Sequence, residues 1–503
     1  MTAFIKHPGG YLDDTPAFPN HVVEVATAVP AFIGYTETAT YESQDLTNKP
    51  WRVSSMGEYL ACFGGPPSAT ALNITPPLTF RVSSTAPTIS PAPARVFTVT
   101  SKDGKTHKDY FVFPAPGTTL YLLYSSMLLF FQNGGGNCYI VSVGSYKDQI
   151  NADKLTAGID LLTKEQEPTM VVIPDAVRLA DIDAFTRVQA HAVRHCGEIR
   201  SRIAILDIYE GYKELADSPV SNFRDNIPIN NLDMAAAYYP WLETTVLGDD
   251  LITPSKYIST ADLTALVTNE GIVDPNVFAD LKDNTGLLDR TLSTGSHAVA
   301  QALADIKRQL NRLPPSPAIA GVCTMVDNTM GVWKAPANVG LNGVTVPSVT
   351  LSDLQQESLN IDVMYGKSVN AIRSFPGRGV LVWGARTLDG NSYDWRYINV
   401  RRTIIMLEQS IMLATKAYVF ENNDPTTWVT ITAMIRDFLS GIWKRGGLAG
   451  RSPDDAFSVT CGLGATMTAE DILEGILRVT VRVAVTHPAE YIDITFQHQM
   501  QTT

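Results

Sequence analysis

The sequence predicts a mixed α/β fold whose middle part is built on a largely parallel sheet. Short apolar runs at 139–143, 170–173 and 202–206 alternate with helical stretches such as 181–194, a pattern typical of buried parallel strands joined by crossover helices. The chain also begins and ends in alternating, β-prone segments. Its 503 residues, 45% of them apolar, are enough for about three domains with their own cores.

The N-terminal end reads as an arm followed by strands. Residues 1–20 are rich in proline and glycine, which disfavours a helix and leaves little to bury. Residues 21–30 alternate, with Val23 and Val25 on one face, so we expect a strand there. A second short strand is expected at 31–35.

Residues 36–137 give a mixed pattern. A serine before 56 and a Gly-Gly pair after 63 are typical of a helix cap and a helix stop, and Asp-Gly between alternating runs is a strong hairpin signal. The expected elements are a helix at 54–63, a Pro-rich loop or insertion at about 64–94, a hairpin of 95–101 with 108–113, and a buried helix at 121–131.

The last third is mostly helical and then β-prone. Asp424 before Pro425 predicts a capped helix start, and apolar residues at helical spacing from 404 to 418 indicate an amphipathic helix. The expected elements are helices at 293–313, 401–420 and 425–444, and strands at 379–383, 476–485 and 491–496.

Composition excludes several functions. The net charge is −12, whereas nucleic-acid binders carry a basic footprint, so nucleic acid and anionic membranes are not expected partners. The longest apolar run, 121–131, is shorter than the ~20 residues of a membrane span. The start of the chain lacks a signal-peptide pattern. Five scattered cysteines without a C-x-x-C motif fit a reducing cytoplasm and argue against a disulfide framework or a zinc knuckle.

No motif predicts an active site. Gly104-Lys105-Thr106 resembles the end of a phosphate loop, but Val99 stands where the first glycine is needed. His191 and His195 share a helix face without companion ligands, so a structural pair is the favoured interpretation. Asp454-Asp455 is read as charge at a helix N-terminus. We therefore expect no cofactor, no metal and no enzymatic activity.

A series of runs in a specific order resembles the sheath proteins of contractile phage tails and contractile injection systems, especially extracellular phage-tail-like systems. The best match lies between 332 and 394, and the resemblance spans roughly 20–500. The motifs are GVWKAPAN at 331–338, NAIR at 370–373, GRG at 377–379, VWGARTL at 382–388 and YINVRR at 397–402, with supporting runs at 31–34, 133–139, 173–175, 238–241 and 438–450. Within them we single out Trp333, Lys334, Pro336, Arg378, Trp383, Arg386, Arg401 and Arg402.

The resemblance implies a domain organisation. It predicts an N-terminal linking arm at 1–20, a core sheath domain made of 21–35 with 365–485, an inserted middle α/β part at 36–364 that carries the variable 64–94 insertion, and a C-terminal linking arm at 486–503. The segments 64–94 and 245–300 match nothing in the family pattern.

The resemblance also implies a function. Subunits would stack as hexameric rings around an inner tube and contract to drive it through a target envelope, with baseplate and terminator or cap proteins as further partners and assembly in the bacterial cytoplasm. Arms would add strands to neighbouring subunits, through Tyr11, Leu12, Val22, Val23, Val25, Tyr491, Ile492, Ile494 and Phe496.

The tube-facing helix would end at Trp443, Lys444 and Arg445, whose two cations suit an acidic tube surface; a solvated helix end is the alternative. A baseplate or cap protein with a sheath-like domain, and an enzyme using the middle α/β part, are the alternative functions.

Overall fold

The computed structural model describes residues 21–67, 79–85, 96–100, 107–270, 285–362 and 364–491. The chain divides into two compact units. The larger unit comprises 26–402 and the residues from 487 onward, and the smaller comprises 403–486 with the residues up to 25. Each unit is described by itself.

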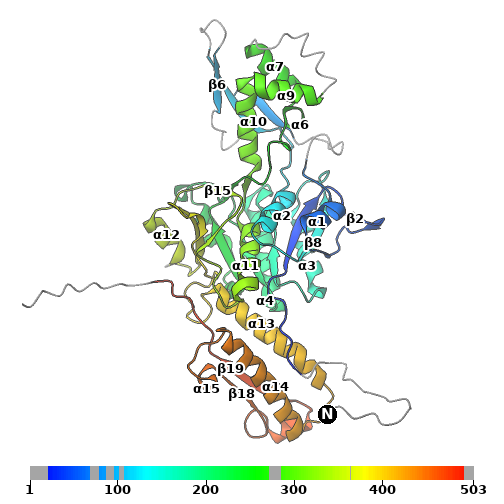
Figure 1. The fold of residues 1–503 in the computed structure, drawn as a ribbon, viewed down its shortest axis with the longest axis vertical. Coiled ribbons are helices and arrows are strands. Elements are labelled where there is room, and N and C mark those ends of the chain that lie inside the picture. The colour runs from blue at the N-terminus through cyan, green and yellow to red at the C-terminus, as the bar shows by residue number, and fades with distance from the viewer. Residues whose placement is uncertain are drawn as a thin grey trace, which may run out of the picture. The chain divides into compact units, whose positions relative to one another are not determined.

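A nine-stranded sheet forms the core of the larger unit (Figure 1). Its six central strands, from β16 to β8 in the order below, are parallel, and antiparallel strands close both edges. The predicted parallel sheet is therefore confirmed. In spatial order the strands are β14 (Val339–Gly340), β17 (Gly379–Val382), β16 (Val369–Phe375), β11 (Ala235–Tyr239), β10 (Ile203–Leu206), β9 (Met170–Val172), β1 (Pro30–Thr36), β8 (Cys138–Ser145) and β4 (Trp51–Val53).

Two pairs of helices cover this sheet. Helix α2 (Leu123–Gln132) packs against α11 (Ser316–Met330), and α3 (Ala152–Leu161) packs against α4 (Ile182–Ile199). Close approaches in β1 place the two pairs on the sheet: Gly34 leaves room for Leu123 of α2, whereas the neighbouring Ile33 contacts Gly158 of α3. Because successive strand residues point to opposite faces, the two helix pairs lie on opposite faces of the sheet. All of β1 is consequently buried.

Two buried aspartates hold the helix pair α2 and α11 in place. Asp175 follows β9 and accepts hydrogen bonds from the backbone amides of Tyr35 (2.7 Å) and Leu122 (2.6 Å). Asp207 follows β10 and accepts from the amide (2.9 Å) and hydroxyl (2.6 Å) of Ser316, at the start of α11. Burial raises the pKa of Asp175 to about 6 and that of Asp207 to about 7. Both carboxyl groups thus have a structural role at the carboxyl ends of two central strands of the sheet.

An outer lobe of the larger unit unites two segments that lie far apart in sequence (top of Figure 1). Arg81 pairs with Asp262 at 2.8 Å, and Gln309 donates to the carbonyl of Val112 at 3.0 Å. The lobe contains the sheet β5 (Phe80–Ser83), β7 (His107–Pro114) and β6 (Phe97–Thr100) together with α6 (Pro254–Tyr257), α7 (Thr260–Glu270), α9 (Thr285–Gly295) and α10 (His297–Leu310). The described residues of 79–114 and of 254–310 therefore build one lobe.

The remaining elements of the larger unit are small. Helix α1 is capped by Ser55 and ends at Gly64, as predicted. The small elements of the larger unit, α1 included, are β2 (Thr40–Tyr41), β3 (Gln44–Asp45), α1 (Met56–Phe63), α5 (Pro219–Asn226), β12 (Leu242–Thr244), β13 (Arg312–Leu313), β15 (Val344–Pro347) and α12 (Asp353–Asn360).

The smaller unit consists of two long helices and a two-stranded antiparallel sheet. Helix α13 (Ile398–Thr415) enters it at Thr403, and α14 (Pro425–Lys444) starts at the predicted Asp424 cap. Helix α14 packs on one strand of the sheet. The other elements are α15 (Pro453–Ala456), β18 (Phe457–Cys461), α16 (Ala469–Leu473) and β19 (Val479–Val483).

Several expected elements differ from the structure. Residues 21–29 are not in a strand, because no described strand lies beside them and β1 begins only at Pro30. The helix expected at 293–313 is divided, since Ser296 accepts from the amide of Val299 and starts α10 anew. The expected arm 1–20, and 492–496 of the last expected strand, lie outside the described residues.

The compact units also differ from the expected domain boundaries. Strand β1 lies between β9 and β8, and β16 lies beside β11. Residues 30–36 and 369–375 are therefore part of the large sheet and do not belong with 403–486, because hydrogen bonds of a parallel sheet tie them to the middle of the chain. The whole of the expected core region from 365 to 402 falls in the larger unit.

Candidate assembly surfaces

A buried ion pair lies at the beginning of α13. Arg402 donates to both carboxylate oxygens of Asp327, at 3.0 and 2.5 Å, and both side chains are almost fully buried. The same guanidinium donates to the carbonyl of Thr27 at 2.9 Å, and the Thr27 hydroxyl donates to Asp327 at 2.7 Å. Burial lowers the pKa of Arg402, but the Asp327 carboxylate more than offsets this and holds the pKa above its usual range. The cluster fixes residue 27 to the larger unit.

A second ion pair fixes the other end of the described chain to the larger unit. Arg386 donates through Nε and Nη2 to the carboxylate of Glu490, at 3.0 and 2.6 Å. The hydroxyl of Tyr397 (3.0 Å) and the side-chain amide of Asn360 (2.9 Å) donate to the same carboxylate. A two-pronged arginine–carboxylate contact with further donors is strong and geometrically specific. Twelve residues, 492–503, follow immediately after Tyr491.

The other motif residues are placed in the larger unit, mostly by packing. Trp383 packs against Phe375 with ring centroids 4.5 Å apart and the rings tilted by 50°, and the guanidinium of Arg401 lies 4.6 Å from the ring centroid of Trp395. Arg378 donates to Asn338 at 2.7 Å beside the turn between β16 and β17. The carbonyl of Trp333 accepts from Asn399, Pro336 is buried and Lys334 is exposed. Six of the eight residues are therefore structural supports in the folded chain: Trp333, Pro336, Trp383, Arg386, Arg401 and Arg402.

An apolar groove opens in the smaller unit between α13 and β19. It has a volume of about 900 Å³. Alternate residues of β19 face it, and these are half-buried, whereas α14 covers the other strand of the sheet. Its main apolar lining is Ile404, Leu407, Ile411, Met412, Val419, Phe420, Ile431, Leu477, Val479, Val481 and Val483. A two-stranded sheet is marginal by itself, and among the described residues no further strand pairs with β19 beside this groove.

The predicted tube-facing end of α14 carries two cations in different settings. Trp443 is half-buried and donates through its indole to the carbonyl of Gly450 at 3.1 Å. Lys444 is exposed. Arg445 pairs with Glu24, so its charge also holds the N-terminal segment of the smaller unit. That this helix end faces a tube stays a prediction.

The residues predicted for the arms are only partly described. Val22 is buried in the smaller unit, Val23 is exposed, and the amide of Val25 donates to the hydroxyl of Ser410 at 3.1 Å. Tyr491 is exposed. Tyr11, Leu12, Ile492, Ile494 and Phe496 lie outside the described residues. Strand exchange through these segments therefore stays a prediction.

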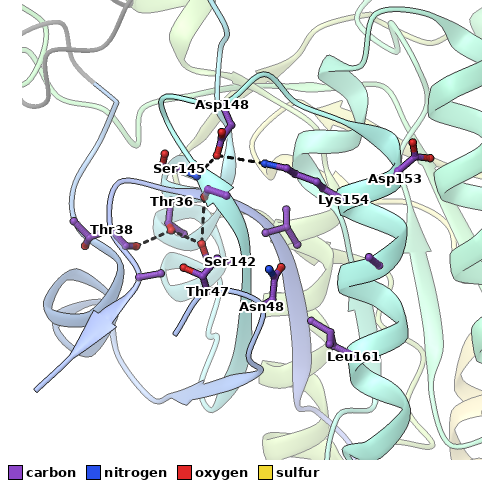
Figure 2. Close-up of a pocket in the computed structure, with 14 residues that line it drawn as sticks. Thr36, Thr38, Thr47, Asn48, Ser142, Ser145, Asp148, Asp153, Lys154 and Leu161 are labelled. Carbon is purple, nitrogen blue, oxygen red and sulfur yellow. Dashed lines mark hydrogen bonds and ion pairs between the residues drawn. The ribbon is translucent and has the colours of Figure 1, made fainter. Parts of the chain in front are cut away.

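A polar pocket of about 600 Å³ lies at the carboxyl ends of β1 and β8 (Figure 2). Its main polar groups already bond to one another: Thr36 to Ser142 at 2.6 Å, and Lys154 to Asp148 at 3.5 Å.

His191, singled out with His195, pairs with Asp160 at 2.6 Å, and burial lowers the pKa of His195 to about 4. In the described ranges no three acidic, histidine or cysteine side chains are grouped to hold a metal ion.

Sequence reasoning missed the two acidic partners. Asp327 and Glu490 stand alone in sequence, 75 and 104 residues from their arginines, and a single carboxylate gives no local signal.

Within the described part of the chain, no helix is long and apolar enough to cross a membrane.

Family comparisons agree with this architecture. The model of the phage tail sheath protein central domain matches residues 148–388, and that of the phage tail sheath C-terminal domain matches 391–499. The tail sheath protein of Vibrio phage KVP40 is 29% identical over 136 residues, and that of Salmonella phage ViI is 27% identical over 139. Each match covers 27% of this chain and about a fifth of the relative's length.

Solved structures resemble the chain over nearly its whole length. A contracted sheath of the anti-feeding prophage is 26% identical, with a TM-score of 0.61 over 98% of this chain and 100% of that one. A chain of the anti-feeding prophage baseplate is 26% identical, with a TM-score of 0.60 over 99% and 100%. The contracted PVC sheath, an extracellular contractile injection system, shares the fold at 24% identity and a TM-score of 0.61 over 99% of both chains. The chain thus belongs to the phage tail sheath protein family, as a contractile sheath subunit of phage-tail or tail-like type.

Proposed function

We propose that copies of this chain stack as hexameric rings around an inner tube and contract to drive the tube through a target envelope. The observation that carries the proposal is the two-stranded sheet of the smaller unit, with its apolar groove between α13 and β19. A strand added at β19 would pair with the exposed backbone edge and place alternate side chains into the groove. Assembly would therefore extend a layer that has two strands in the described part of the chain.

The last residues of the sequence suit this role. Ile492, Ile494 and Phe496 alternate with polar residues, which gives one apolar face at the period of a strand. The N-terminal residues would supply a second added strand through Tyr11, Leu12, Val22, Val23 and Val25. Such exchange ties subunits together by backbone hydrogen bonds, so connectivity can survive while rigid units rotate.

Free energy for contraction would be stored in the extended lattice itself. The helix end at Lys444 and Arg445 would touch the tube, and baseplate and terminator or cap proteins would bound the polymer. Assembly would take place in the bacterial cytoplasm. A sheath-like role in the baseplate is the second candidate, favoured by the likeness to a chain of the anti-feeding prophage baseplate.

The test is to express the chain with and without tube protein and to examine the high-speed pellet by negative-stain electron microscopy. Striated hollow cylinders support the proposal. Val481→Asp, which puts a charge into the groove, should abolish them. Thr480→Asp is the matched control, because Thr480 is exposed and lies on the other face of the same strand. Absence of cylinders with tube protein present, or equal loss in both variants, would contradict the proposal.

A further inference from the structure

Exposed apolar side chains occur on three segments of the larger unit, one of which ends at Tyr491, the last described residue. Met364, Tyr393 and Tyr491 are 81%, 85% and 69% exposed, and Ile361 and Tyr365 are also exposed. Single exposed apolar residues are ordinary, but a contiguous apolar patch indicates an interaction site. By contrast, the outer lobe exposes none of its described large apolar side chains.

Hydrogen bonds join the three segments that carry these residues. The amide of Gly390 donates to the carbonyl of Gly366 at 3.0 Å, which ties the loop of Met364 to that of Tyr393. Arg386 donates to the carbonyl of Asn360 at 3.1 Å while it holds Glu490. The segments that carry these exposed side chains are therefore joined to one another, and we call the set of side chains the exit patch: Ile361, Met364, Tyr365, Tyr393 and Tyr491.

The exit patch is also pre-organised. The guanidinium of Arg396 lies 4.7 Å from the ring centroid of Tyr393, and the ammonium of Lys367 lies 5.3 Å from that of Tyr365. Such contacts restrict the rings before any partner arrives, which lowers the entropy cost of docking. Methionine and tyrosine are residue types enriched at protein–protein interfaces. The patch thus has the chemistry of a protein contact.

We infer that the exit patch docks against a second copy of this chain, namely the copy that receives residues 492–503. This inference rests on the proposed strand exchange. The expected arm, 486–503, includes Tyr491 of the patch, and the twelve residues after Tyr491 reach at most about 40 Å when extended. The groove that receives the arm must therefore lie within about 40 Å of Tyr491, and we expect the surface of that copy to cover these side chains.

The first test places a photoreactive benzoylphenylalanine at Met364 of the full chain. After irradiation of assembled polymer, the expected product is a covalent adduct of two chains. Its peptide map should link residue 364 of one chain to the second chain, and not to residues 492–503 of the same chain. The unassembled fraction should give no such adduct. A link to the same chain's 492–503, a link to another protein, or no adduct in the polymer would overturn the inference.

The second test uses charge. Met364→Asp with Tyr393→Glu should reduce pelleted polymer at least tenfold while leaving the melting temperature of the unassembled chain unchanged, since both side chains are exposed. Leu60→Asp is the matched control, because Leu60 is an exposed apolar residue on α1. Normal assembly of the double variant, or equal loss with Leu60→Asp, would overturn the inference.

Removing residues 492–503 separates this inference from the function on which it rests. If the truncated chain still forms normal sheaths, the strand exchange fails and the inference falls with it. If truncation abolishes sheaths but Met364→Asp with Tyr393→Glu assembles normally, the exit patch alone is refuted.

Discussion

Arg386 and Glu490, 104 residues apart in sequence, are joined by a two-pronged ion pair inside the larger unit. Arg386 belongs to a loop after β17, whereas Glu490 follows directly on the stretch that returns from the smaller unit at residue 487. Taking two charges out of water is costly, and the pair is stable only because every lone pair finds a donor. Tyr397 and Asn360 supply those donors. The pair therefore fixes the last residues that the structure describes to the larger unit.

Removing one partner of this pair should be strongly destabilising. Glu490→Ala leaves Arg386, which is 5% exposed, as an uncompensated buried charge, and such changes cost about 3–5 kcal/mol. Urea denaturation followed by a probe in the larger unit measures the loss. Replacing both partners, as in Arg386→Met with Glu490→Leu, should recover most of the stability, because apolar replacements of buried pairs are often neutral.

The control is the exposed pair of Arg436 and Asp454, which are 3.4 Å apart. Asp454→Ala should change stability by less than about 1 kcal/mol, as is usual for surface pairs. Equal effects of Glu490→Ala and Asp454→Ala would show that the Arg386 contact contributes little.

The Arg402–Asp327 pair should hold the N-terminal segment. Asp327→Asn weakens both the ion pair and the hydrogen bond from the Thr27 hydroxyl. Hydrogen exchange of the backbone amides at 26–29 should then speed up at least tenfold. Thr27→Val removes only the hydroxyl bond and should have a smaller effect. Unchanged exchange in Asp327→Asn would contradict this anchoring role.

Local signals in the sequence were enough for most elements of the large sheet. Apolar runs predicted β8, β9 and β10, and cap residues predicted the starts of α1 and α14, because these depend on neighbours in sequence. The segment 21–29 was predicted wrongly, since its alternation favours a strand only if a partner edge is present. Site prediction found Arg386 and Arg402 through family motifs. It missed Asp327 and Glu490, because tertiary folding alone brings these carboxylates to their arginines.

Asp207 should make stability depend on pH. Burial raises its pKa from 3.8 to about 7, so between about pH 4 and 7 the folded chain keeps a proton that the unfolded chain has lost. This contribution is fully present below pH 4 and is lost as the pH rises through 7. At about 1.4 kcal/mol per pKa unit, the change amounts to a few kcal/mol at most.

Asp207→Asn removes this titration while its carbonyl oxygen can still accept from the amide of Ser316. The melting temperature of the wild-type chain should therefore fall relative to that of Asp207→Asn between pH 4.5 and pH 8. Asp454→Asn, at an exposed site, should run parallel to the wild type. Parallel curves for wild type and Asp207→Asn would show that Asp207 does not change its protonation across this window.

Arg445, at the predicted tube-facing end of α14, pairs with Glu24, so a test of the tube contact should leave this pair intact. Changing Lys444 and Arg445 together to glutamate would weaken attraction to an acidic tube, but it would also break an ion pair inside the smaller unit. Lys444→Glu alone is the cleaner variant, because Lys444 is exposed. We expect it to reduce tube-templated assembly, measured by co-sedimentation with tube protein, and more strongly at low salt because ions screen exposed charges.

A charge swap, Arg445→Glu with Glu24→Arg, keeps the internal pair while it moves the positive charge to another residue. If Arg445 acts only by holding residue 24, the swapped chain should assemble on tube as well as the wild type. If Arg445 itself faces the tube, the swap should lower co-sedimentation, as Lys444→Glu does. Normal co-sedimentation of Lys444→Glu at every salt concentration would exclude the end of α14 as the tube contact, because this variant reverses the charge without disturbing the pair with Glu24.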